Sequence, residues 1–164
     1  MYKGELETFL EEKGFIIRKG KEDFRLSSGW CGPYEIVHGD RSLKEKIKPE
    51  IKKTFEDVEG LYVYLKGDKI LYVGKGKPIW ARVWSHFRES FEVVGGDRLK
   101  IWHQFFKNKT HCGEVRVYWK ELKDEKMRII VEKMLAYVLD PEFVSFHESK
   151  KQKSRTTPTR DKLN

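Results

Sequence analysis

Residues 60–86 contain five side chains of the types that act on phosphate esters. They are Tyr62, Tyr72, Lys75, Arg82 and His86. Hydrolysis of a phosphodiester requires an activated water, neutralisation of the developing charge and help for the leaving oxygen. Arginine holds a phosphate through two parallel hydrogen bonds, a geometry that lysine cannot match. The stretch therefore contains the parts of a phosphate-binding hydrolytic site.

Proton transfer and the leaving group call for two more components. Tyrosine is a poor base because its pKa is about 10, but a neighbouring lysine or histidine can favour its ionised form or accept its proton. A divalent cation held by a carboxylate helps with charge and leaving group. Glu132, amid apolar residues of a later helical segment, is the candidate carboxylate. Taken singly, each residue has an ordinary structural interpretation, and only their joint occurrence favours a site.

A hairpin must bring the two tyrosines together. Residues 60–65 and 69–73 are rich in β-branched and aromatic residues and predict two strands. A two-residue turn at Gly67 and Asp68 would place Tyr62 and Tyr72 on opposite faces. A three-residue loop would pair the tyrosines directly. A shared site requires the second register, or a bulge with the same effect.

The other groups are expected on helices that follow. A helix is predicted from Pro78, with Arg82 and His86 four residues apart on one face. Residues 97–107 predict another helix and residues 114–119 a strand. Residues 124–139 predict the last helix, which carries Glu132 and begins at Asp124.

The front of the chain contains no recognisable chemistry. We expect a helix over residues 3–13, short strands at 15–17 and 24–26, a possible strand at 34–37, and a helix that begins at Pro49. Trp30, Cys31 and His38 are interpreted as packing and turn residues.

Composition narrows the class of protein. The 164 residues are 38% hydrophobic and 13% aromatic, enough for one domain with a real core. We expect no membrane span or signal peptide, and the two unpaired cysteines are consistent with the cytoplasm. Residues 1–59 carry 12 Lys and Arg against 13 Asp and Glu, residues 60–147 carry 16 against 11, and residues 148–164 carry 6 against 2. This distribution favours a polyanionic partner, most simply DNA.

The ordered motifs resemble the GIY-YIG nuclease family, in particular its UvrC-type core. Gly60-Leu61-Tyr62 corresponds to the first tripeptide and Tyr72-Val73-Gly74 to the second, with Lys75 directly after. Arg82 and His86 follow at the family's spacing. Glu132, with Pro141 nine residues later, resembles the final motif, although Val144 occupies the place of the family's usual asparagine. The resemblance covers residues 60–146.

This resemblance implies a fold and a division of the chain. The fold is α+β: a small three-stranded antiparallel sheet flanked by helices, with an N-terminal helical and β extension. Residues 1–59 would be the extension, packed on or beside the core, residues 60–147 the nuclease core, and residues 148–164 a basic, mobile tail.

The resemblance also implies roles for the site residues. Glu132 would bind one Mg²⁺ or Mn²⁺ ion and Arg82 would hold the phosphate. Tyr62 would act as general base, assisted by His86 or Lys75, while Tyr72 orients the phosphate or the water. Lys77 and Arg88 would contact the nucleic-acid backbone.

Two functions remain open on these observations. The first is a metal-dependent DNA endonuclease, a compact restriction-like or mobile-element enzyme that acts on double-stranded DNA either alone or as a homodimer. The second is a DNA-binding module of the same fold with weakened or lost catalysis, which the replacement of the asparagine by Val144 favours.

Overall fold

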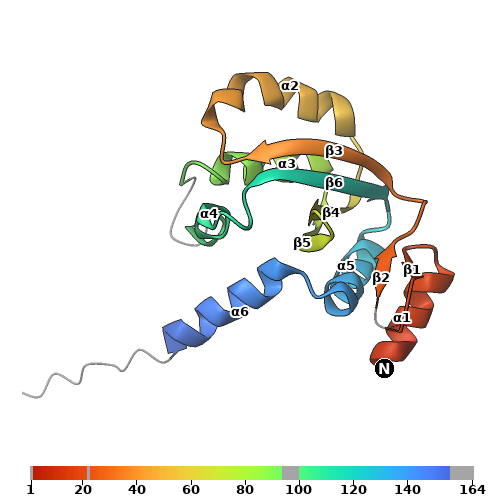
Figure 1. Cartoon of the computed structure of the whole chain (residues 1–164). Helices are drawn as coiled ribbons and strands as arrows, with labels where there is room; N and C mark the ends of the chain where they lie inside the picture. Colours follow the sequence, from red (N-terminus) through yellow and green to blue (C-terminus); the bar gives the residue numbers. More distant parts are fainter. Residues whose placement is uncertain (1, 22, 94–99, 156–164) are drawn as a thin grey trace, which may run out of the picture.

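The computed structural model describes residues 2–21, 23–93 and 100–155, with Lys100 and residues 153–155 described by their backbone alone. Helices and two antiparallel sheets make an α+β fold, which confirms the predicted class. The smaller sheet pairs β1 (Ile16–Arg18) with β2 (Phe24–Leu26), next to α1 (Lys3–Glu12) (Figure 1).

The main sheet has four strands in the order β3-β6-β4-β5, so the prediction of three strands is wrong. The strands are β3 (Cys31–His38), β4 (Gly60–Lys66), β5 (Lys69–Gly76) and β6 (Gly113–Glu121). Gly32 and Pro33 made the start of β3 look like a turn. A register shift between Cys31 and Tyr34 accommodates both residues, and β3 then pairs with β6 as far as His38.

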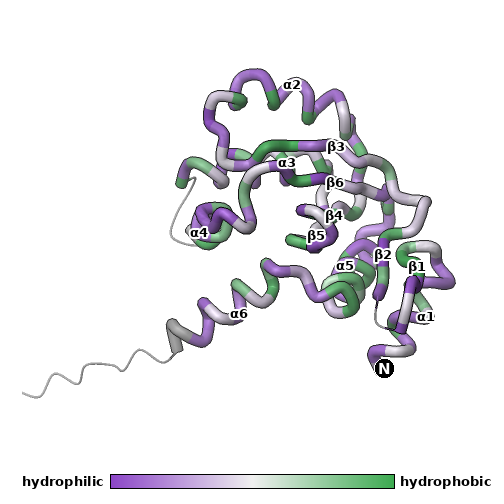
Figure 2. The backbone as a smooth tube through the Cα atoms, viewed as in Figure 1, coloured by the Kyte–Doolittle hydropathy of each residue, from purple (hydrophilic) through white to green (hydrophobic). Residues whose placement is uncertain are grey.

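Helices cover both faces of this sheet. On one face Tyr62, Tyr64 and Val117 join a core with α2 (Lys44–Phe55), α3 (Ile79–Glu89) and α4 (Lys100–Lys107). On the other face Leu61 and Val63 pack with residues of α5 (Glu125–Leu139) and α1. Figure 2 shows that α5 is more hydrophobic than α2, which lies on the opposite face of the sheet. Strand β5 forms one edge of the sheet, and both α3 and α5 contact it.

Helix α2 begins before Pro49, contrary to the prediction that it starts there. A short 3-10 turn (Arg41–Leu43) leads into it, and Pro49 lies inside the helix on its exposed side. Ile47, Ile51 and Phe55 are buried at intervals of four residues. Because Pro49 faces solvent, water can satisfy the carbonyl group that loses its helical partner, and the burial of Ile47 favours the earlier start.

Helix α5 matches its prediction, but it is followed by another helix. The Asp124 side chain accepts a hydrogen bond from the Met127 backbone N–H at 2.9 Å and caps the start of α5. Asp140, with a φ of 48°, ends the helix before Pro141. Helix α6 (Glu142–Arg155) comes next, so residues 148–155 are helical where a mobile tail was expected. Residues 156–164, and residues 97–99 of the helix predicted at 97–107, lie outside the described residues.

Candidate active site

The β4–β5 hairpin places its tyrosines on one face by means of a bulge. The turn has two residues, Gly67 and Asp68, and Leu65 pairs with Ile70 beyond it. A register shift next to Leu65 then reverses the faces, so that Tyr64 pairs with Tyr72. Direct pairing of Tyr62 with Tyr72 is not observed. Their ring centroids are nevertheless only 5.8 Å apart, so the two tyrosines share a face as a common site requires.

Gly74 makes room for this tyrosine cluster. It lies opposite Tyr62 in the register, and its neighbours leave no space for a side chain. A Cβ at this position would meet the Tyr62 ring at 2.5 Å and Tyr72 at 2.6 Å. The glycine that ends the tripeptide Tyr72-Val73-Gly74 therefore has a steric reason.

We expect Gly74→Ala to destabilise the fold by about 1–3 kcal/mol, because the added methyl group must displace two packed rings. Denaturant unfolding measures the effect. Gly4→Ala is the matched control, because a Cβ on Gly4 in α1 meets nothing within 4 Å. Equal stability of the Gly74→Ala variant and the wild type would contradict this account of Gly74.

His86 lies beneath the tyrosines in the core. Its side chain is 1% exposed and stacks on Trp102 with a centroid distance of 4.1 Å. Its Nδ1 atom is 2.9 Å from the hydroxyl of Tyr64, a residue that the sequence did not single out. Burial, followed by the charges of Arg82 and His38, lowers the pKa of His86 well below 6.5. The imidazole is therefore neutral at physiological pH and positions Tyr64.

Arg82 is the positive charge that faces the tyrosine cluster. It interacts electrostatically with Tyr62, Tyr64 and Tyr72, and in each case it favours the ionised phenol. Burial has the larger and opposite effect. Burial raises the pKa of Tyr62 well above 10.0, and burial together with Glu132 raises that of Tyr72. Both phenols are protonated at neutral pH.

A cavity of about 390 Å³ opens at the sheet edge, between β5, α3 and α5. We call it the edge cavity. It is lined by Tyr72, Lys75, Gly76, Lys77, Arg82, Glu125, Arg128, Ile129 and Glu132. The Nζ atom of Lys75 is 3.7 Å from Oε2 of Glu132. This ion pair joins β5 to α5 across the cavity.

The edge cavity brings together some of the predicted site residues and leaves others out. Tyr72, Lys75, Arg82 and Glu132 line it, as does the predicted backbone contact Lys77. Tyr62 does not line it and is fully buried, so its hydroxyl cannot reach a water in the cavity in this conformation. His86 is buried as well. Tyr62 and His86, predicted to act together as the general base, therefore have no access to the cavity in this conformation.

Arg88, predicted as a backbone contact, lies elsewhere. It packs over the ring of Trp84, with its guanidinium carbon 5.6 Å from the ring centroid. It also borders a groove that includes residues of α2. Arg88 and Arg82 therefore serve two different surfaces of α3.

Two cavity residues were missed by the sequence reasoning. Glu125 lies seven residues before Glu132, which is two helical turns and so the same face of α5. That spacing was the signal that could have identified it. Arg128 is buried, donates to the Leu122 backbone carbonyl at 2.9 Å, and lies 3.6 Å from Glu59. It fixes the first turns of α5 against the rest of the chain.

The cavity suits a magnesium ion held by few protein ligands. Among the residues that the structure describes, no group of three or more His, Cys, Asp or Glu side chains could hold a metal. Magnesium, however, commonly binds through one or two carboxylates together with waters and substrate phosphates. Glu132 and Glu125 offer two carboxylates in the edge cavity. The donor set therefore fits Mg²⁺ or Mn²⁺ with the substrate present.

Comparisons with protein-family models, curated proteins and solved structures found no match. Within the described ranges, no helix is long and apolar enough to cross a membrane.

Proposed function

We propose that this protein is a metal-dependent DNA endonuclease with a GIY-YIG-like site in the edge cavity. One observation carries the proposal. The hairpin and Glu132, which are far apart in the sequence, contribute to the same cavity, and Lys75 and Glu132 meet there at 3.7 Å. Cations, a phenol and carboxylates around an open cavity are the groups that phosphodiester hydrolysis requires.

In this proposal Arg82 and Lys75 bind the scissile phosphate. The guanidinium offers two parallel donors to phosphate oxygens, and Lys75 adds a point charge from β5. Lys75 is 42% exposed and can turn from Glu132 toward a substrate. Glu132, with Glu125 two turns earlier on α5, would hold Mg²⁺ or Mn²⁺, which when bound neutralises charge on the phosphate and the leaving 3′ oxygen.

The phenol that reaches the cavity is Tyr72, so we assign the contact with the attacking water to it. In its phenolate form, which the charge of Arg82 favours, its oxygen accepts the proton of the water and becomes the neutral hydroxyl. Tyr62 and Tyr64 pack against its ring, with centroids 5.8 Å away in both cases, and hold it in place. His86 supports this cluster through Tyr64.

Cleavage is therefore expected to accelerate with pH. The reactive form of Tyr72 is the phenolate, and its pKa is raised above 10.0, so the reactive fraction grows about tenfold per pH unit between pH 7 and 9. Single-turnover rates across this range measure the slope. The Tyr72→Phe variant should be slow and lose the slope. A wild-type rate that levels off near pH 6 would assign the proton transfer to a histidine.

A binding module without catalysis is the second candidate, favoured by the place of His86. The imidazole is buried and hydrogen-bonded to the hydroxyl of Tyr64. Val144 on α6 stands where the family usually has an asparagine and supplies no side-chain amide to the site. Such a protein would bind DNA through Lys75, Lys77 and Arg82 and leave it uncut.

Mapping of the cleavage ends on a defined library of DNA duplexes tests the proposed function. With Mg²⁺ present, we expect new ends with a 3′ hydroxyl, because the 3′ oxygen is the proposed leaving group, and the library reports any sequence preference. Ends that carry a 3′ phosphate would contradict the proposed chemistry. Duplexes that are bound but remain intact would support the binding module.

A further inference from the structure

A second basic surface lies on α3, on the side of the helix that borders α2. A groove of about 570 Å³ runs between α2 and α3, and we call it the α2–α3 groove. Its lining residues are Lys44, Glu45, Lys48, Pro49, Lys52, Trp84 and Arg88. Four of these seven side chains are cationic and only Glu45 is acidic. The groove thus has the charge of a site for a polyanion.

The cations are held in position by tryptophan rings. The Nζ atom of Lys52 is 4.7 Å from the centroid of Trp80, and that of Lys48 is 5.3 Å from the centroid of Trp84. Arg88 packs over Trp84 as well. A cation on an aromatic face keeps its N–H donors available to another ligand, and its side chain is already ordered. These contacts orient the positive charges before any partner binds.

The two central lysines are not committed to carboxylates. Lys44 pairs with Glu92 at 3.5 Å. By contrast, no described acidic side chain lies within ion-pair distance, 4.0 Å, of Lys48 or Lys52. Both lysines are exposed, and they lie one helical turn apart, about 6 Å along α2. A row of charges with this spacing suits consecutive phosphates of a nucleic-acid strand.

We propose that the α2–α3 groove binds the phosphate backbone of duplex DNA, with Lys48, Lys52 and Arg88 as the principal contacts. The choice of DNA as the polyanion rests on the proposed function. Helix α3 carries both surfaces, with Arg82 at the edge cavity and Arg88 at the groove. Arg82 and Arg88 are six residues apart on α3, about 9 Å along its axis, or roughly three base pairs at 3.4 Å each. This spacing would let one duplex contact both.

The test compares DNA binding of charge variants in EDTA, where cleavage does not interfere. For Lys48→Gln/Lys52→Gln we expect about tenfold weaker binding of a 20-base-pair duplex at 100 mM salt. We also expect a slope of log K against log [salt] that is shallower by about 1.8, which is two charges at about 0.9 each. Fluorescence anisotropy over a series of salt concentrations measures both quantities.

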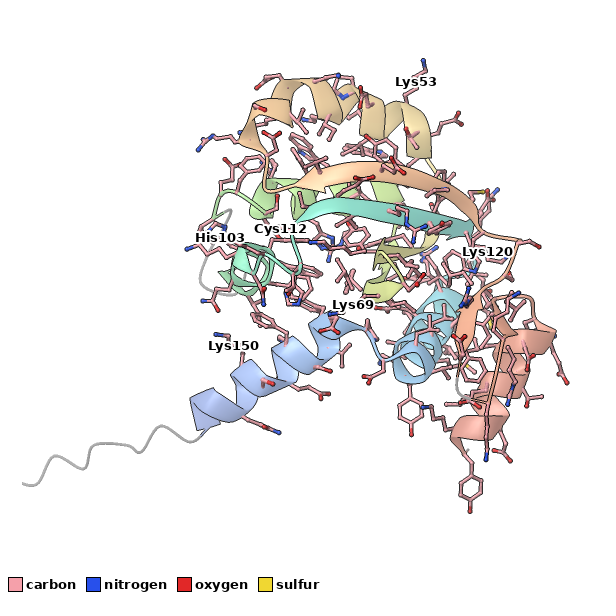
Figure 3. All side chains as sticks on the ribbon, in the orientation of Figure 1. Lys53, Lys69, His103, Cys112, Lys120 and Lys150 are labelled. Carbon is pink, nitrogen blue, oxygen red and sulfur yellow. The ribbon has the colours of Figure 1, made fainter. Side chains whose placement is uncertain are left out.

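Two further variants separate the groove from net charge and from folding. Lys46→Gln/Lys53→Gln removes the same charge from the exposed outer side of α2, where Lys53 projects away from the sheet (Figure 3). It should bind nearly as wild type. Lys48→Arg/Lys52→Arg keeps the cations over the rings and should restore binding. Equal losses in the groove and outer-side variants, or no loss in either, would overturn the proposal.

The same variants distinguish failure of the groove from failure of the proposed function. If the wild type cuts DNA in Mg²⁺ and the groove variant binds and cuts equally well, the groove proposal fails and the nuclease stands. If the wild type never cuts, but its binding depends on Lys48 and Lys52, the nuclease fails and the groove stands. A wild type that binds no duplex at 50 mM salt contradicts both.

Discussion

Glu132→Gln is expected to reduce Mg²⁺-dependent DNA cleavage by at least about 10³-fold. The amide keeps the shape of the carboxylate but removes the charge that would hold the cation, and charge stabilisation of this kind contributes several kcal/mol to catalysis. The fold should survive, because the ion pair lost with Lys75 is only partly buried, its two charged atoms are 3.7 Å apart, and such pairs contribute little to stability. Single-turnover cleavage measures the loss of rate, and thermal unfolding measures whether the fold is kept.

The matched control for Glu132 is Glu121→Gln. Glu121 is an exposed carboxylate on β6, 3.3 Å from Lys123 and outside the edge cavity, so its loss should leave cleavage unchanged. If the Glu132→Gln variant cut as fast as the wild type, the carboxylate of Glu132 would have no part in the chemistry of the site. Equal slowing of both variants would indicate a general effect of charge.

Arg82→Lys is expected to slow cleavage about 10²–10³-fold while the net charge is unchanged. Lysine cannot make the two parallel hydrogen bonds to phosphate, and it would face the three tyrosines with a more mobile point charge. Duplex binding should change much less, because the positive charge remains. The separation of rate from binding is the informative part of this measurement.

Arg25→Lys provides the control for Arg82. Arg25 is exposed on β2, 3.6 Å from Asp23 and outside the edge cavity. The Arg25→Lys variant should cut DNA at the wild-type rate. If Arg82→Lys were equally active, a bidentate phosphate clamp would not be part of the chemistry.

Hydrophobic periodicity predicted most of the elements that position the site. The hairpin, the helix after Pro78 and the helix with Glu132 lie where alternating or four-residue patterns placed them. The extent of β3 was missed because Gly32 and Pro33 have turn chemistry, and pairing with β6 outweighs it. The predicted start of α2 at Pro49 was wrong, because the burial of Ile47 in the folded protein outweighs the local cost of a proline inside the helix.

The sequence predicted which residues form the site better than it predicted what each of them does. Spacing identified Tyr72, Lys75, Arg82 and Glu132, which line one cavity. Whether a side chain can reach a substrate depends on its burial, and the sequence does not show which side of a cluster faces water. Tyr62 and His86 were therefore predicted to be reactive, although both are buried in the core.

The basic groove was hidden from the sequence for a related reason. Residues 1–59 are nearly neutral in sum, so they gave no sign of a polyanion site. Folding sets Lys48 and Lys52 beside Arg88 from the next segment.

Incubation of the wild-type protein with supercoiled plasmid tests the central claim most directly. In Mg²⁺ we predict that nicked and then linear DNA accumulates, and that an excess of EDTA stops the reaction at once. Plasmid that stays supercoiled in both Mg²⁺ and Mn²⁺ with protein in excess, or cutting that continues in EDTA, would contradict a metal-dependent nuclease.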